Sequence, residues 1–265
     1  MKPAAFDYVR AKSWAEAVQL VGSGARPGAG TQSLGPLLNL RLARPDTIVD
    51  MRHLPHFGGV TLVGNVVRIG AGTTHAAIED GAVPGRTGEI MAGVARRIAY
   101  RPVRNRGTIG GSLAHADPSA DWVAVMPAIG GVAIAVGANG ERRIPLSAFV
   151  TGIFETALAP DELLRAIEVP ALPSTARWGH WKFCRKVGEF SKATACVLLS
   201  EGAKPRAVLA ALDGPPLVLE DASALLADPV GEANRIVLAF EQLAPWRRAL
   251  AEAALGQAVK AVVTP

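Results

Sequence analysis

The sequence predicts an α+β protein made of two successive parts. Strand and helix patterns alternate up to a proline-containing linker at 170–174, three strand patterns then follow in a row, and helical patterns fill the rest of the chain. Runs of strands followed by runs of helices are typical of the α+β class. With 265 residues, 49% of them hydrophobic and 19% charged, the chain can bury one large or two small cores and is too apolar for disorder.

The first elements resemble a βαβ crossover. A helix is predicted from Ser13, because Ser13 and Glu16 have the spacing of a capping box. A glycine-rich turn at 28–33 leads into leucines at helical spacing over 34–42, and 47–51 has a strand pattern. Turn, helix and strand in this order favour a crossover, although the segment before the turn has few apolar residues for a first strand.

Shorter elements follow. Two strands over 60–69, joined by Gly-Asn, predict a hairpin, and Thr74 is placed to cap a short helix. We further expect a helix over 91–98, an extended segment over 103–106 and a tight turn over 107–112.

The remaining pattern runs from the middle of the chain to its end. Asp117 followed by Pro118 predicts the start of a helix over 122–128, and Asn139-Gly140 predicts a hairpin turn. A single strand is expected over 163–169. Three more strands are then expected at 178–184, 193–199 and 207–212, and three helices at 221–227, 232–243 and 246–263.

Charge and cysteine content exclude several classes of protein. The 28 Lys and Arg residues exceed the 23 Asp and Glu residues by five, which permits anionic ligands without naming one. Cys184 and Cys196 cannot hold an iron–sulfur cluster or a four-thiolate zinc, so we predict two free thiols in a reducing compartment and leave one disulfide open. The longest uncharged run, 122–140, is broken by Pro127 and predicts no membrane span, and the N-terminus lacks a signal-peptide pattern. We expect a cytoplasmic protein.

Motif searches narrow the chemistry further. The chain contains no P-loop, no His-Glu-x-x-His, no Cys-x-x-Cys and no Gly-x-Ser-x-Gly, so phosphoryl transfer on a P-loop, zinc proteolysis and serine hydrolysis lose support. The Gly-Ala-Gly-Thr turns at 28–31 and 70–73 do not complete Gly-x-Gly-x-x-Gly. A standard Rossmann cofactor site is therefore not predicted.

Two glycine-rich, hydroxyl-bearing turns remain, which we call the first cradle (28–33) and the second cradle (107–112). Their glycines let backbone N–H groups approach an anion, and hydroxyls at Thr31, Ser33, Thr108 and Ser112 can donate to phosphate oxygens. This combination suits a pyrophosphate. Taken alone, each turn can equally be a simple connector.

Other polar residues have plainer interpretations. The five arginines of 96–106 are more often a solvated face or a partner surface than a ligand site. Asp117 fits a helix cap, whereas Asp121 is freer to reach a ligand hydroxyl. His53 and His56 flank Pro55 and are expected in a surface loop rather than on a metal. The aromatic and basic residues around Lys182 favour core packing over nucleic-acid stacking, so neither a metal nor a nucleic-acid partner is predicted.

Three ordered blocks carry a resemblance to a known family. The segment 103–121, Val-Arg-Asn-Arg-Gly-Thr-Ile-Gly-Gly-Ser-Leu-Ala-His-Ala-Asp-Pro-Ser-Ala-Asp, resembles the second flavin-binding motif in the FAD (medium) subunit of molybdenum hydroxylases, the carbon monoxide dehydrogenase and xanthine dehydrogenase family. The first cradle with 34–45 is similar to the first motif of that family, and 69–75 to its next block. Residues 149–170 and 182–186 extend the similarity to about residue 200.

The resemblance implies a fold, a cofactor and partners. It implies a two-part FAD-binding domain of the vanillyl-alcohol-oxidase (PCMH-type) fold over 1–172, with subdomains of about 1–55 and 56–172, and a small C-terminal α/β domain of three antiparallel strands and helices over 173–265. An iron–sulfur (2Fe-2S) small subunit would receive electrons from a molybdopterin-containing large subunit and pass them through FAD to NAD or a quinone. The implied cofactor-binding residues are Ala29, Gly30, Thr31, Gln32, Ser33, Leu34, Thr108, Ile109, Gly110, Gly111, Ser112, Asp117, Asp121, Leu163 and Lys182.

The chain also departs from the family pattern. Thr31 stands where the first motif of the family has its second glycine, and the C-terminal domain is short. The departures leave two alternatives to the electron-transfer subunit open: a flavin-free scaffold or assembly subunit on the same fold, and a free-standing flavin oxidase. No catalytic acid–base pair is expected, because such a subunit works by positioning its cofactor.

Overall fold

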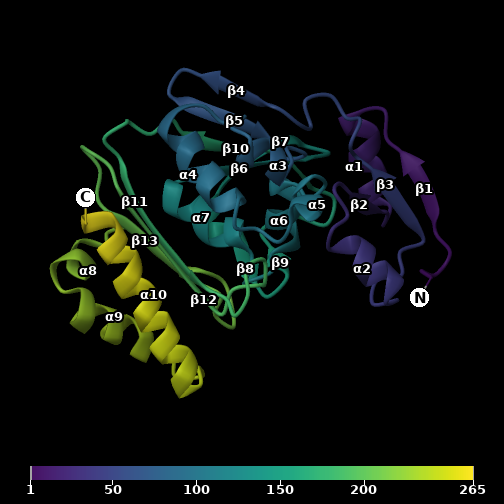
Figure 1. Cartoon of the computed structure of the whole chain (residues 1–265). Coiled ribbons are helices and arrows are strands. Elements are labelled where there is room, and N and C mark those ends of the chain that lie inside the picture. The colour runs from purple at the N-terminus through teal and green to yellow at the C-terminus, as the bar shows by residue number, and fades with distance from the viewer. Residues whose placement is uncertain (1, 265) are drawn as a thin grey trace.

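The computed structural model describes residues 2–264, which form three main sheets and a two-stranded ribbon with helices packed around them (Figure 1). The predicted α+β class is confirmed. Figure 1 also shows that the chain runs from a small N-terminal layer, through a central sheet with its helices, to a C-terminal sheet with helices on its outer side.

The N-terminal layer is a parallel three-stranded sheet in the order β1-β3-β2. Its elements are β1 (Asp7–Arg10), α1 (Trp14–Gly22), β2 (Arg26–Gly28), α2 (Leu34–Asn39) and β3 (Thr47–Asp50). Ser13 caps α1 as predicted, accepting a hydrogen bond from the Glu16 N–H. The weak first strand of the crossover exists as β2, and it tolerates Pro27 because it lies at the edge of the sheet. The sequence did not predict β1, whose four residues lack a clear apolar alternation.

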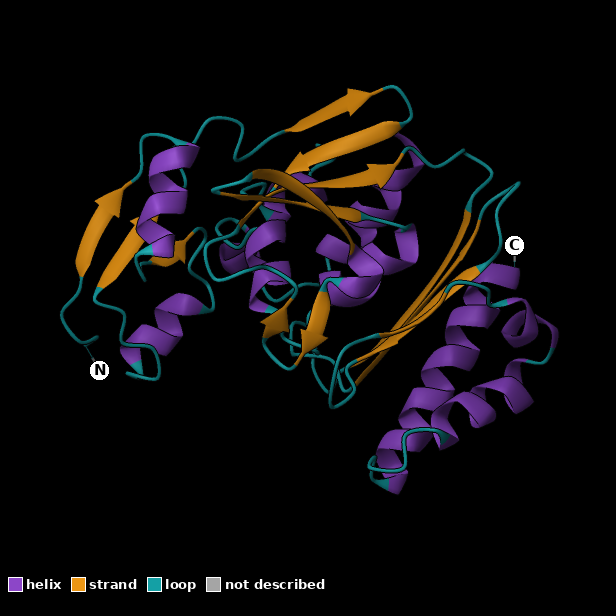
Figure 2. Ribbon diagram, turned by 180° about the vertical axis from the view of Figure 1, so that it is seen from behind, coloured by secondary structure: helices purple, strands orange, loops and turns teal. Residues whose placement is uncertain are grey.

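The central layer is a five-stranded antiparallel sheet in the order β4-β5-β10-β6-β7. Its strands are β4 (Val60–Val63), β5 (Val66–Gly70), β6 (Val132–Gly137), β7 (Gly140–Pro145) and β10 (Leu163–Pro170). The helices on one side of it are α3 (His75–Glu79), α4 (Gly85–Ala95), α5 (Arg101–Arg104), α6 (Ile109–His115) and α7 (Asp121–Ile129) (Figure 2). Both predicted hairpins are confirmed. A short 3-10 turn (Leu146–Ala148) and the ribbon of β8 (Val150–Gly152) and β9 (Glu155–Thr156) join β7 to β10.

The C-terminal layer is an antiparallel sheet of four strands rather than the expected three. Its elements are β11 (Arg177–Phe183), β12 (Ala193–Leu199), β13 (Arg206–Ala210), β14 (Leu217–Leu219), α8 (Ser223–Ala227), α9 (Pro229–Leu238) and α10 (Pro245–Val263). The sheet lies between α7 and α10, so β12 is buried on both faces and is almost wholly apolar. Gly179 permits the contact with α10, because a Cβ there would lie 1.9 Å from the Ala258 carbonyl oxygen.

Three local predictions were wrong. The extended segment expected over 103–106 is instead α5 and its C-cap, because Pro102 stands in the first turn of a helix, where its missing N–H costs nothing. The tight turn expected over 107–112 is a short loop followed by the start of α6, with Thr108 as the N-cap. Asp117 does not cap α7: its carboxylate accepts from the Ser119 N–H, and α7 begins at Asp121 after Ala120.

Two smaller expectations are confirmed. Cys184 and Cys196 are free thiols. His53 and His56 lie exposed in the loop after β3. Within residues 2–264 no helix combines the length and the apolar character that a membrane crossing needs.

Candidate functional site

The two cradles, which the resemblance assigns to one cofactor, meet in space. Gly30 lies directly against the loop that opens the second cradle: a Cβ on Gly30 would sit 1.9 Å from the Arg106 carbonyl oxygen and 2.9 Å from Gly107 Cα. Only glycine allows two backbones to approach this closely. The contact joins the edge of the N-terminal sheet to the loop before α6.

The first cradle leaves its backbone donors free. Within the described chain, the backbone N–H groups of Thr31, Gln32 and Ser33 donate to no backbone or side-chain acceptor. The side-chain amide of Gln32 donates to the Gly30 carbonyl at 3.2 Å. Thr31 has a φ of +58°, a left-handed conformation that is costly for a β-branched residue. Strained residues with unpaired donors beside a cavity are typical of binding turns.

In the second cradle most backbone N–H groups donate to acceptors within the protein. The Ile109 N–H donates to the Thr73 carbonyl at 3.0 Å, and the Gly110 N–H donates to the Ala71 carbonyl at 2.9 Å. Thr108 caps α6 by accepting from the Gly111 N–H at 3.0 Å, and it forms an antiparallel bridge with Thr74. The third glycine-rich block, 69–75, therefore holds the second cradle in place.

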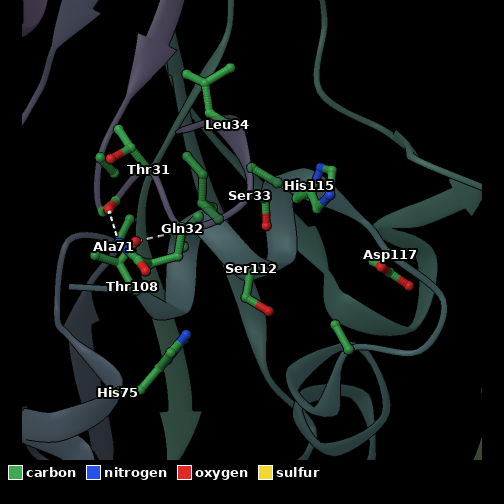
Figure 3. A pocket seen from close by; sticks show the side chains of 18 of the residues that line it. Thr31, Gln32, Ser33, Leu34, Ala71, His75, Thr108, Ser112, His115 and Asp117 are labelled. Carbon is green, nitrogen blue, oxygen red and sulfur yellow. Dashed lines mark hydrogen bonds between the residues drawn. The ribbon is translucent and has the colours of Figure 1, made fainter. Parts of the chain in front are cut away.

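The cradles open into one cavity of about 390 Å³. It lies between β2 and α2 on one side and α5, α6 and α7 on the other, and β10, β11 and the loop at 188–190 complete its wall. Figure 3 shows Ser33 and Ser112 facing this space from the two cradles. Of the fifteen residues predicted to bind the cofactor, fourteen line the cavity; Ile109 is fully buried and does not.

Asp121 and Lys182 form a buried ion pair in the wall of the cavity. The Lys182 ammonium lies 2.9 Å from both carboxylate oxygens of Asp121, and both residues are less than 10% exposed. Burial raises the pKa of Asp121, and the Lys182 charge opposes that rise. The pair joins the first turn of α7 to β11. Asp121 is thus not a free carboxylate, although it lies at the cavity as predicted.

Two arginines of the run make structural ion pairs, and Arg96, Arg97 and Arg106 lie exposed as expected of a solvated face. Arg104 is buried, pairs with Glu79 at 2.7 Å and donates to the carbonyls of Ile98 and Ala99, while Arg101 binds Glu79 and Asp80. The Arg104 guanidinium lowers the pKa of Glu79. In the described chain none of the five arginines lines the cavity.

The cavity also contains residues that sequence reasoning missed, among them two histidines and one aromatic ring. His75 is 6% exposed, and burial together with the nearby Arg104 charge lowers its pKa to about 4. His115 is half-buried, packs on Phe154 and also has a lowered pKa, mainly through burial. Phe190 lines the cavity although it is 65% exposed. His75 belongs to the 69–75 block, which was the signal available for it; no periodicity marks the other two.

Comparison with protein families identifies the class. The chain belongs to the family described as FAD binding domain in molybdopterin dehydrogenase, whose model matches residues 4–172. Its cofactor is FAD, and it is an oxidoreductase subunit, the FAD-binding medium subunit of a molybdenum hydroxylase.

Individual relatives agree with this assignment. The chain is 37% identical over 220 residues to the 6-hydroxypseudooxynicotine dehydrogenase complex subunit alpha of Paenarthrobacter nicotinovorans, covering 81% of this chain and 74% of the relative. It is 38% identical over 204 residues to the carbon monoxide dehydrogenase medium chain of Afipia carboxidovorans, covering 76% and 70%. Among solved structures, a cyanide-inactivated Cu,Mo-CO dehydrogenase superposes with a TM-score of 0.89 at 32% identity, covering 99% of each chain.

Proposed function

We propose that the chain carries electrons, through FAD, from a 2Fe-2S small subunit to an external acceptor, NAD or a quinone. In this proposal a molybdopterin-containing large subunit oxidises the substrate and reduces the cluster. The complexes named for the relatives support the assembly, since the relatives are a dehydrogenase complex subunit and a carbon monoxide dehydrogenase medium chain. The expected cytoplasmic location stays a prediction.

The cavity supports the binding of a dinucleotide. The unpaired N–H groups of the first cradle and the hydroxyls of Ser33 and Ser112 are neutral donors that suit a pyrophosphate, and they face each other across one space. This juxtaposition of two cradles from distant parts of the chain is the observation that carries the proposal.

We assign the predicted residues accordingly. Residues 29–34 and 108–112, with Ile109 acting only as buried support, would hold the pyrophosphate, with Asp117 beside the second cradle. Asp121 and Lys182 would hold the ribityl or ribose hydroxyls, and Leu163 would border the flavin ring. Phe190, whose ring is exposed at the cavity wall, would cover it. The FAD-binding domain in this proposal is 1–172, and 173–265 closes the cavity through β11 and the loop after it.

The protein itself positions rather than reacts. When FAD is bound it supplies reversible redox chemistry at its isoalloxazine ring, so the protein needs no acid–base pair of its own. Its residues fix the dinucleotide by neutral donors and shield one wall of the cavity with the apolar Leu163, Leu164 and Leu158. Exclusion of water there favours electron transfer over side reactions.

The test uses the complex purified through a tag on this chain. We expect one FAD per chain, a co-purified subunit with a 2Fe-2S signal in electron paramagnetic resonance, and a pterin-containing subunit. After reduction by dithionite and removal of the reductant, NAD or a quinone should reoxidise the cluster rapidly only in FAD-loaded complex. Equal reoxidation with and without FAD would refute the electron path, and steady turnover of an organic substrate by this chain alone would favour a free-standing oxidase.

A further inference from the structure

The side chain of His75 has one ring nitrogen occupied and one facing the cavity. The indole N–H of Trp122 donates to His75 Nδ1 at 3.1 Å, and both residues are buried. Nε2 has no hydrogen-bond partner among residues 2–264 and is not sealed from the cavity that His75 lines. In Figure 3 the ring points from α3 toward Thr108 and Gln32, with a nitrogen at its leading end.

This contact fixes which nitrogen carries the proton. An indole N–H is a donor only, so Nδ1 must offer its lone pair, and the proton of the neutral ring lies on Nε2. Burial keeps the ring neutral, as does the nearby positive Arg104, itself paired with Glu79 of α3. His75 therefore presents an uncharged N–H donor to the cavity.

The ring also stands where the two cradles meet. A Cβ on Gly107 would contact His75 Cδ2 at 2.9 Å and Nε2 at 3.0 Å, and Gly107 lies against Gly30 as well. The backbone N–H of His75 donates to the Gly107 carbonyl at 2.9 Å. Both the backbone and the ring of His75 therefore contact the second cradle. The donor is thus preorganised next to the free donors of the first cradle.

We infer that His75 is a further FAD-binding residue that donates its Nε2–H to an oxygen acceptor of the dinucleotide, and that Trp122 is the positioning residue that holds it in this tautomer. The inference rests on the proposed function, because it assumes that FAD occupies this cavity. It assigns to α3 a direct part in recognition that the two cradles alone do not provide, and to Trp122 of α7 a supporting part.

Substitutions separate the donor from the shape of the ring. Gln at position 75 can place an amide N–H near the position of Nε2, whereas Leu cannot donate. In titrations of the full chain, and of the complex, with FAD followed by flavin fluorescence, we expect H75L to weaken binding about 5- to 20-fold and H75Q to stay within about 3-fold of the unmodified protein. The exposed His53 supplies the control: H53L should bind as the unmodified protein does.

A spectroscopic measurement keeps the inference testable if H75L fails to fold. Nitrogen-15 spectra of the unmodified chain labelled at histidine should show the neutral Nε2–H tautomer of His75 between pH 6 and 8, and its Nε2 signal should shift when FAD is added. W122F should allow the Nδ1–H tautomer to appear.

The outcomes are distinct. H75L binding as tightly as the unmodified protein, equal losses in H75L and H75Q, or an Nδ1–H tautomer in the unmodified chain would each overturn the inference while the proposed function stands. Failure of the unmodified chain and complex to bind FAD would overturn both.

Discussion

The two cradles share a composition of glycines and hydroxyls but differ in where their hydrogen bonds go. In the first cradle the N–H groups of Thr31 to Ser33 find no acceptor within the described chain, whereas in the second those of Ile109 and Gly110 are bound by Thr73 and Ala71. The first cradle follows the edge strand β2, and the second, which includes the first turn of α6, packs against the start of α3 and the block at 69–75. The first cradle thus has backbone donors available to a ligand, whereas the second uses its donors mainly to hold its neighbours in place.

The difference shows that a glycine-rich motif has two possible physical causes. Gly30 and Gly110 are required because another backbone lies where a Cβ would be, and neither requirement involves a ligand. What marks a binding turn is the unpaired donor, not the glycine. Changes in the second cradle and in its supports should therefore lower stability, while changes in the first should affect ligand binding more.

The largest expected effect concerns the ion pair in the cavity wall. Lys182→Met leaves the buried Asp121 carboxylate without its partner, which should lower the free energy of unfolding by about 3–5 kcal/mol. Urea denaturation measures it. The double variant Asp121→Asn with Lys182→Met should recover most of the loss; if it unfolds as readily as the single variant, the pair is not coupled and its role is ligand binding alone.

The stability of the protein should depend on pH through His75, which lies against Gly107 of the second cradle. The pKa of His75 is lowered to about 4 against 6.5 in the unfolded chain, so the unfolded state binds the proton first as the pH falls. The contribution of neutral His75 to the free energy of unfolding is fully present above pH 6.5 and is lost progressively down to pH 4. The loss between pH 7 and pH 5 is about 2 kcal/mol. His180, with a pKa near 3 and a buried Nε2 without a partner among the described residues, should act in the same direction.

Urea denaturation at pH 7 and pH 5 checks this expectation. In H75Q the difference between the two pH values should shrink by about 2 kcal/mol relative to the unmodified chain. An unchanged difference would mean that His75 already takes up its proton near pH 6.5 in the folded state. Because the comparison is between two proteins at the same two pH values, the titration of the carboxylates cancels.

A packing comparison uses two glycines, Gly110 in the second cradle and Gly35 just after the first. In Gly110→Ala the new Cβ would meet Ala71 Cβ at 2.4 Å and its carbonyl oxygen at 2.7 Å, so we expect a loss of about 3 kcal/mol. Gly35, in the first turn of α2, has no neighbour within 4 Å of such a Cβ, and Gly35→Ala should stabilise by up to about 1 kcal/mol. Equal effects at the two sites would contradict the packing argument.

The sequence predicted elements wherever a local signal decides them. The two hairpins, the Ser13 and Thr74 caps and the buried strands have turn chemistry or apolar runs that need no distant partner. The sequence failed where a tertiary contact decides. Asp121 appeared free until β11 brought Lys182 to it, and the buried Arg104 pairs with Glu79, 25 residues away, a contact that no local pattern shows.

The same limit applies to the site. The cradles could be found because glycines and hydroxyls cluster in sequence, and their meeting followed from one ligand being assigned to both. The tautomer of His75 could not be found, since it depends on Trp122, 47 residues away. Which cradle has free N–H groups could not be found either, because it depends on the carbonyls of Ala71 and Thr73, which only the fold brings to the second cradle.

The smallest expected effect is a pair of substitutions, one in each cradle, that should change the free energy of unfolding in opposite directions. Thr31 has a φ of +58°, so Thr31→Gly removes a left-handed strain of about 1–2 kcal/mol and costs about 0.5–1 kcal/mol of chain entropy, for a net gain of about 0.5–1 kcal/mol. Thr108 has a φ of −118° and caps α6, so Thr108→Ala should lose about 1 kcal/mol. Thermal unfolding of both variants without FAD measures the pair. A loss at both positions would mean that the Thr31 side chain makes stabilising contacts that outweigh its strain, and the first cradle would then resemble the second.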